Sequence, residues 1–198
     1  MENLGALSIL LAFCVAVFAV FAALAGKYGR RPALAVSAER AVYSVWVLLT
    51  IASGLLIYAL VVGDFRLAYV ASHSNRAMPT LYKITAWWGG QEGSLLLWTW
   101  LLASYSCIAL YTNRRKFRKM MPIVVAILMT TEAFFLSLIA FVVSPFQVLM
   151  AGRGIIDVPD GQGLDPLLQW LTMAIHPPML YLGYVGATIP FAFAMASL

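Results

Sequence analysis

Five long stretches of this chain carry almost no charge, and they limit its possible folds more than any other feature. Each approaches the roughly 20 residues that a helix needs to cross about 30 Å of hydrocarbon. They predict transmembrane spans near residues 4–25, 41–63, 93–112, 121–143 and 177–198. Of the 198 residues, 63% are hydrophobic and 11% are charged, whereas soluble domains carry about 25% charged residues. We therefore expect an all-α, polytopic membrane helix bundle forming a single membrane domain over residues 1–198, and not a soluble, disordered or disulfide-rich protein.

The basic residues predict which side of the membrane each loop faces. Nine of the thirteen Lys and Arg residues lie in the short segments 27–40 and 113–119. Short basic loops are retained in the cytoplasm, so the N-terminus and the longer loops 64–92 and 144–176 are expected on the outer, periplasmic side of the inner membrane. The net charge of +5 then reflects loops at the membrane edge, where they meet lipid head groups, and it does not predict a nucleic-acid partner.

The first outer loop ends in aromatic and glycine residues. Trp87 and Trp88 precede the segment Gly89–Ser94, in which Glu92 is the acidic residue. Glycines permit tight turns and close approach of the backbone, and an acidic side chain is stabilised at the start of a helix. Two interpretations remain open: a turn into the third span with Glu92 at the helix start, or a flat aromatic surface that binds a flat apolar ligand.

The second outer loop contains a predicted helix start and a predicted break. Asp165 suits an N-cap and Pro166 the first helical position. The run Leu167–Ile175 would extend only about 14 Å, which predicts a short interfacial helix. Since two prolines should not continue a helix, we expect it to stop at His176 and the fifth span to begin at Pro177. His176 is then either a capping residue or a metal ligand.

Two further residues invite both a structural and a functional interpretation. Glu132 lies near the middle of the fourth span, where a charge is costly. It is either a protonated carboxyl bonded to a neighbouring helix or a functional site, for example in a transporter fragment. His73, in the first outer loop, is either a hydrogen-bonded loop residue or a functional one.

Some functions have no support in the sequence. There is no C-x-x-C-H motif, so the chain carries no covalent haem of its own. There is also no Walker A sequence, no H-E-x-x-H and no G-x-S-x-G. Cys14 and Cys107 fall within predicted spans and are expected to be inert thiols.

Four motifs, in order along the chain, resemble those of one membrane protein family. They occupy residues 69–75 (YVASHSN), 88–98 (WGGQEGSLLLW), 164–169 (LDPLLQ) and 176–186 (HPPMLYLGYVG). The resemblance is to the N-terminal third of CcmF, the haem lyase subunit of cytochrome c maturation, with NrfE, CcmC and CcsA as relatives. It implies a chain that receives haem b from the chaperone CcmE on the outer face. The haem is then presented to apocytochrome c held by a CcmH-type protein.

The resemblance also implies site residues. In that family the histidine of the H-P-P motif is one of two outer histidines assigned to haem, so His176 is expected to be an axial ligand of haem iron. Trp87, Trp88, Glu92 and Tyr181 are further candidates for the haem site. Family members are several times longer, and their tryptophan-rich motif, second outer histidine and intramembrane histidines have no counterpart here.

A partner chain, the remaining part of the haem lyase, must then complete the site. Any enzymatic activity would be that of a subunit or fragment of a holocytochrome c synthase-type haem lyase. Two alternatives remain: a non-ligating scaffold subunit that docks the haem-bearing chain and the chaperone, and a transporter fragment that uses Glu132.

Overall fold

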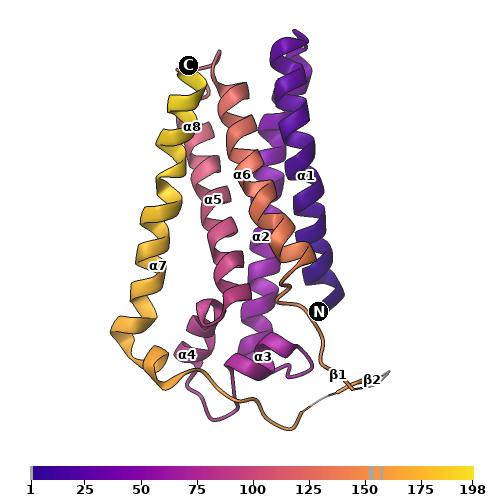
Figure 1. The fold of residues 1–198 in the computed structure, drawn as a ribbon, viewed down its shortest axis with the longest axis vertical. Helices are drawn as coiled ribbons and strands as arrows, with labels where there is room; N and C mark the ends of the chain where they lie inside the picture. Colours follow the sequence, from indigo (N-terminus) through magenta and orange to yellow (C-terminus); the bar gives the residue numbers. More distant parts are fainter. Residues whose placement is uncertain (1, 152–153, 157) are drawn as a thin grey trace.

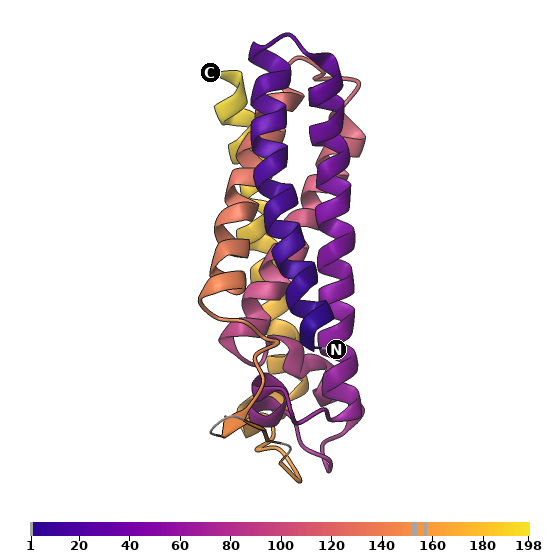
Figure 2. The same cartoon turned by 90° about the vertical axis from the view of Figure 1, so that its right-hand side faces the viewer.

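The computed structural model describes residues 2–151, 154–156 and 158–198, and it confirms an all-α membrane bundle. The body consists of four long helices (Figures 1 and 2). These are α1 (Glu2–Tyr28), α2 (Pro32–Val62), α5 (Gln91–Asn113) and α6 (Met121–Phe141). The α1 helix packs on α2, α2 on α5 and α5 on α6, and α6 closes the bundle against α1.

Small side chains hold α1 close to its neighbours. Ala12, Ala16, Ala19 and Ala23 are all fully buried, and their spacing of three or four residues places them along one stripe of the helix. Stripes of small residues permit close approach of helix backbones in a membrane. Larger residues of α1, such as Phe18 and Phe21, are more than half exposed and face the surroundings of the bundle.

The last candidate span lies at one edge of this body. It comprises α7 (Leu171–Gly186) and α8 (Thr188–Ser197) and contacts α5 and α6 (Figure 1). In the most apolar 18-residue segment of this span only 11% is buried, against 39–56% in the corresponding segments of the other four spans. Most of the surface of this span is therefore open to lipid or to other protein.

The break expected at His176 is wrong, because α7 continues through Pro177 and Pro178. The fifth candidate span accordingly begins at Leu171 rather than at Pro177. Membrane helices tolerate internal prolines where neighbouring groups bind the carbonyls that lose their donors. The interfacial helix expected over Leu167–Ile175 is divided between the 3₁₀ turn η2 (Pro166–Gln169) and the start of α7. Its start is confirmed, since the Asp165 side chain accepts the Leu167 N–H at 2.8 Å.

The two long loops pack together at one end of the bundle, and both basic connections lie at the other (Figure 1). Besides η2, the described part of the loops contains α3 (Ala68–His73), α4 (Thr80–Thr85), the 3₁₀ turn η1 (Ala86–Trp88) and the antiparallel strands β1 (Met150–Ala151) and β2 (Gly154–Ile155). Backbone hydrogen bonds join the loops, for example from Ala68 N to Gln147 O at 2.8 Å and from Gln162 N to Ala71 O at 2.7 Å. The loops thus form one layer beneath the helices.

Candidate functional site

His176 lies on the open side of α7, close to the loop layer. The residue is exposed, and in the part of the chain that the structure describes no hydrogen bond involves its imidazole. One turn to either side, Met173, Met179 and Leu180 are 41%, 61% and 42% exposed. An accessible imidazole between apolar side chains is an arrangement that suits a flat, apolar ligand carrying a metal.

The base of α7 is tied to the first outer loop through Trp88. In an unbroken helix the carbonyl of Ala174 would accept the N–H of residue 178, but Pro178 has none. The indole Nε1 of Trp88 donates to this carbonyl at 3.1 Å instead. The hydrogen bond supplies a donor for one of the two carbonyls that the prolines leave free, and it joins the WGGQEGS segment to the turn of α7 just before the HPP segment.

Tyr181 ties α7 to α5 on the other side of His176. Its hydroxyl lies 3.4 Å from Ser94 Oγ, which in turn donates to the Trp88 carbonyl at 3.0 Å. Its ring meets Trp98 edge-on, with centroids 5.2 Å apart. Five residues of helix turn Tyr181 about 140° away from His176, so the two side chains do not share a face.

The two adjacent tryptophans have different environments. Trp88 is half-buried, whereas Trp87 is 8% exposed and packs against Trp88 and Trp100 at centroid distances of 6.2 and 5.9 Å. The indole nitrogen of Trp87 has no hydrogen-bond partner among the described residues. Trp87 therefore contributes to the interior of the loop layer rather than to an open aromatic surface.

Glu92 occupies the first turn of α5, as expected from its place at the helix start. It is half-buried, and the preceding Gly90 is an N-cap without a side-chain hydrogen bond. The carboxylate lies where the partial positive charge of the helix N-terminus favours it.

Sequence reasoning did not foresee the pair Tyr69 and His73, which explains the glycines of the WGGQEGS segment. The buried Tyr69 hydroxyl lies 2.8 and 3.0 Å from the carbonyl oxygens of Ala86 and Trp87 and accepts the Gly90 N–H at 3.1 Å. Burial raises the pKa of this phenol above its usual value, although the bond from Gly90 opposes the shift. The His73 ring stacks on Tyr69 at 4.3 Å. In the sequence, the two residues are four positions apart, a spacing that places side chains on one face of a helix; this was the signal that could have predicted the pair.

The glycines fit closely against this pair. A Cβ on Gly90 would meet the His73 ring, and one on Gly93 would meet the Trp87 carbonyl and the Tyr69 hydroxyl. His73 Nδ1 is 3.0 Å from the Tyr69 carbonyl oxygen and donates to it, because a carbonyl oxygen can only accept. His73 is thus a packed loop residue, and the glycines are needed for the packing.

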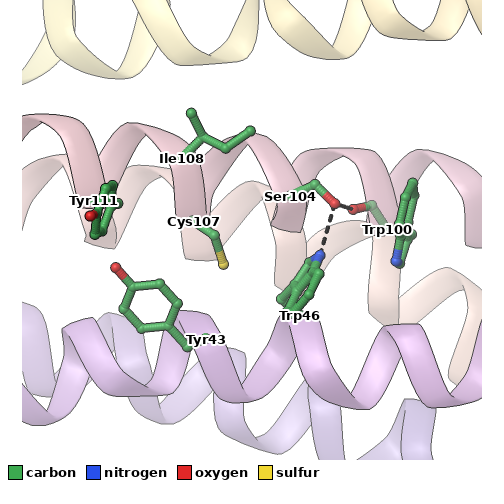
Figure 3. Close-up of a pocket in the computed structure, with 7 residues that line it drawn as sticks. All are labelled: Tyr43, Trp46, Trp100, Ser104, Cys107, Ile108 and Tyr111. Carbon is green, nitrogen blue, oxygen red and sulfur yellow. Dashed lines mark hydrogen bonds between the residues drawn. The ribbon is translucent and has the colours of Figure 1, made fainter.

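A groove of about 420 Å³ between α2 and α5 contains none of the predicted site residues (Figure 3). It is lined by Tyr43, Trp46, Trp100, Ser104, Cys107, Ile108 and Tyr111. The Trp46 indole donates to Ser104 Oγ at 2.9 Å across it. The groove lies within the spans, so lipid or another helix can reach it.

Glu132 is fully buried on α6, and neither carboxyl oxygen has a hydrogen-bond partner among the described residues. The bond to a neighbouring helix that was one of two interpretations is therefore not present in this structure. The described residues also contain no group of three or more His, Cys, Asp or Glu side chains able to hold a metal ion.

Comparison with known proteins identifies the family. The sequence profile described as "Cytochrome C assembly protein" matches residues 88–198, more than half of the chain. The chain belongs to the cytochrome c assembly protein family. The matched residues include α5, α6, α7 and α8, and with them the two segments that the Trp88 indole joins.

Individual members of the family match nearly the whole chain. The cytochrome c-type biogenesis protein CcmF of Pseudomonas fluorescens is 37% identical over 197 residues, which cover 99% of this chain and 29% of that protein. NrfE of Haemophilus influenzae is 34% identical over 198 residues, 100% of this chain and 30% of its own length. The chain thus spans less than a third of the curated relatives it matches.

A solved structure agrees with the fold. The chain described as "Cytochrome c Heme Lyase CcmF" superposes with a TM-score of 0.80 at 28% sequence identity, over 99% of this chain and 30% of that one. Together with the five apolar helices among the described residues, the family establishes an integral, multi-pass membrane protein. The resemblance seen in the four motifs is confirmed.

Proposed function

We propose that this chain is part of a cytochrome c maturation haem lyase and that His176 is an axial ligand of haem iron. The observation that carries the proposal is the imidazole of His176, which is exposed on α7 without a hydrogen bond in the described part of the chain. It belongs to the H-P-P segment of a family whose relatives include a protein named a haem lyase. Neutral imidazole is the common protein ligand of haem iron.

The residues present fit haem as a substrate bound on one side by this chain. Met173, Met179 and Leu180 provide apolar contact for a porphyrin beside the imidazole. The chain supplies one axial ligand, and a partner chain, the remaining part of the lyase, supplies the other. When bound, haem b offers its vinyl groups to the thiols of an apocytochrome. The contribution of His176 is to hold it in position, which is a proximity effect.

The other candidates act around this ligand. Trp88 and Tyr181 fix α7 against α5, Glu92 shapes the start of α5, and Trp87 fills the loop layer beneath them. The haem chaperone CcmE, a CcmH-type protein and apocytochrome c would approach at the same end of the molecule. We place this end in the periplasm and the basic connections on the cytoplasmic side of the inner membrane. The separation of basic connections and long loops to opposite ends supports this orientation.

The test compares His176→Ala with Thr172→Ala, a control that changes an exposed residue one turn earlier on the same helix. Both variants are produced in cells that make c-type cytochromes, and two quantities are measured: haem that co-purifies with the lyase and yield of mature cytochrome c. We expect His176→Ala to lower both at least tenfold and Thr172→Ala to leave both unchanged. Wild-type haem content in His176→Ala would refute the ligand role and favour the non-ligating scaffold.

A further inference from the structure

Two consecutive prolines leave an unusual gap in the hydrogen bonding of α7. Pro177 and Pro178 have no N–H, so the carbonyls of Met173 and Ala174 lack the donors that a regular helix supplies. Both carbonyls lie in the turn directly before His176. Unsupported, this turn would be the part of α7 most free to bend, because prolines are a principal cause of helix kinks.

The first outer loop provides a donor for one of these carbonyls. The Trp88 indole reaches Ala174 O from 86 residues earlier in the chain, at 3.1 Å. Trp88 is itself held in place, because Ser94 Oγ donates to its carbonyl at 3.0 Å. This bond holds the backbone from which the half-buried indole donates.

A second bond returns to α7 beyond His176. The Tyr181 hydroxyl lies 3.4 Å from Ser94 Oγ, the same oxygen that bonds to Trp88. The connected groups therefore contact α7 two residues before His176, at Ala174, and five residues after it, at Tyr181. They lie on the side of the helix toward α5, so the imidazole is left on the open side.

We propose that Trp88 is a positioning residue for His176: its indole N–H replaces the donor that Pro178 lacks and so fixes the direction of the imidazole. The importance of this direction for haem rests on the proposed function. The hydrogen bond and its effect on α7 do not depend on the proposed function. Trp88 acts through the helix backbone rather than through contact with the ligand.

The first experiment measures the effect on α7 without haem. Amide hydrogen exchange is followed in a peptide covering residues 171–183 of the full chain in lipid nanodiscs. Trp88→Phe keeps an aromatic ring and removes the N–H. Exchange should become roughly two- to tenfold faster, the change expected from loss of one hydrogen bond. The matched control is Trp46→Phe, which removes an indole bond to Ser104 in the distant groove and should leave this peptide unchanged.

The second experiment separates the hydrogen bond from ring packing. Pro178→Ala restores an N–H at position 178 and gives Ala174 O a donor within the helix. In this background Trp88→Phe should change exchange by less than twofold. An equal effect of Trp88→Phe in both backgrounds would overturn the proposal, because it would show that Trp88 stabilises α7 by packing alone.

The third measurement connects the bond to the ligand. The absorption spectrum and amount of haem that co-purify with the lyase should shift in Trp88→Phe and return toward wild type in Trp88→Phe/Pro178→Ala. If His176→Ala retains haem while the exchange results stand, the ligand role fails and the positioning of α7 survives. If exchange is unchanged in Trp88→Phe, the positioning role fails whatever the haem content.

Discussion

Replacement of Gly93 by alanine tests whether the WGGQEGS segment is held by packing on Tyr69. A Cβ at this position would overlap the Trp87 carbonyl and the Tyr69 hydroxyl, and it would lie 2.7 Å from Tyr69 Cζ. Forcing an additional carbon into a packed core costs about 1–3 kcal/mol. Displacing the Tyr69 hydroxyl leaves buried polar groups unpaired, at about 1–3 kcal/mol. Alanine favours a helix over glycine by about 1 kcal/mol, so we expect the free energy of unfolding to fall by about 3 kcal/mol in total.

The assay is thermal unfolding of the purified chain in detergent micelles, with Gly54→Ala as the matched control. Gly54 also lies within a membrane-spanning helix, and a Cβ there would meet nothing within 4 Å. At about 2–4 °C per kcal/mol for a chain of this size, Gly93→Ala should lower the midpoint by about 6–12 °C. Gly54→Ala should leave it unchanged or raise it by a few degrees. Similar midpoints for the two variants would refute the packing argument.

Three further outcomes are expected. Because burial raises the pKa of Tyr69, the stability that its neutral phenol contributes is present below about pH 10, the pKa of an exposed tyrosine. It is lost as the pH rises toward the pKa of the folded state. The stability measured by circular dichroism should therefore fall less steeply above about pH 10 in Tyr69→Phe than in the wild type; the same steepness in both would contradict this. Glu132→Leu should keep or raise the thermal midpoint, because the buried carboxyl has no hydrogen-bond partner among the described residues; a drop of several degrees would reveal a partner. In a background without native cysteines, a membrane-impermeant thiol reagent applied to intact cells should label Ser72→Cys but not Lys116→Cys, and the reverse pattern would invert the proposed orientation.

Features that depend on neighbouring residues could be predicted from the sequence. Hydropathy indicated which segments form apolar helices, because a helix in lipid satisfies its own backbone whatever surrounds it, but it did not indicate that the fifth begins at Leu171. The start of the turn at Asp165 was also predictable, since the cap and the N–H that it accepts are two residues apart. These signals need no knowledge of the tertiary fold.

Features that depend on distant residues could not be predicted. Two prolines are expected to end a helix, and the donor that the Ala174 carbonyl receives in place of the missing Pro178 N–H is on Trp88, far back in the chain. The different environments of Trp87 and Trp88 follow from which indole faces Trp100 and which faces α7. For His176, the sequence and the family resemblance indicated the residue, and the structure added its exposure on an unbroken helix.

The closure of α6 against α1 has a consequence for the order in which the protein assembles during synthesis. The α1 helix can pair with α2 as soon as both helices have entered the membrane, because the two are adjacent in the chain and in contact. The four-helix body is complete only when α6 is inserted and returns to α1. The last candidate span, α7 and α8, follows and meets a complete four-helix body in which the Trp88 indole is already available. The prolines of α7 therefore enter the membrane after the group that compensates for them.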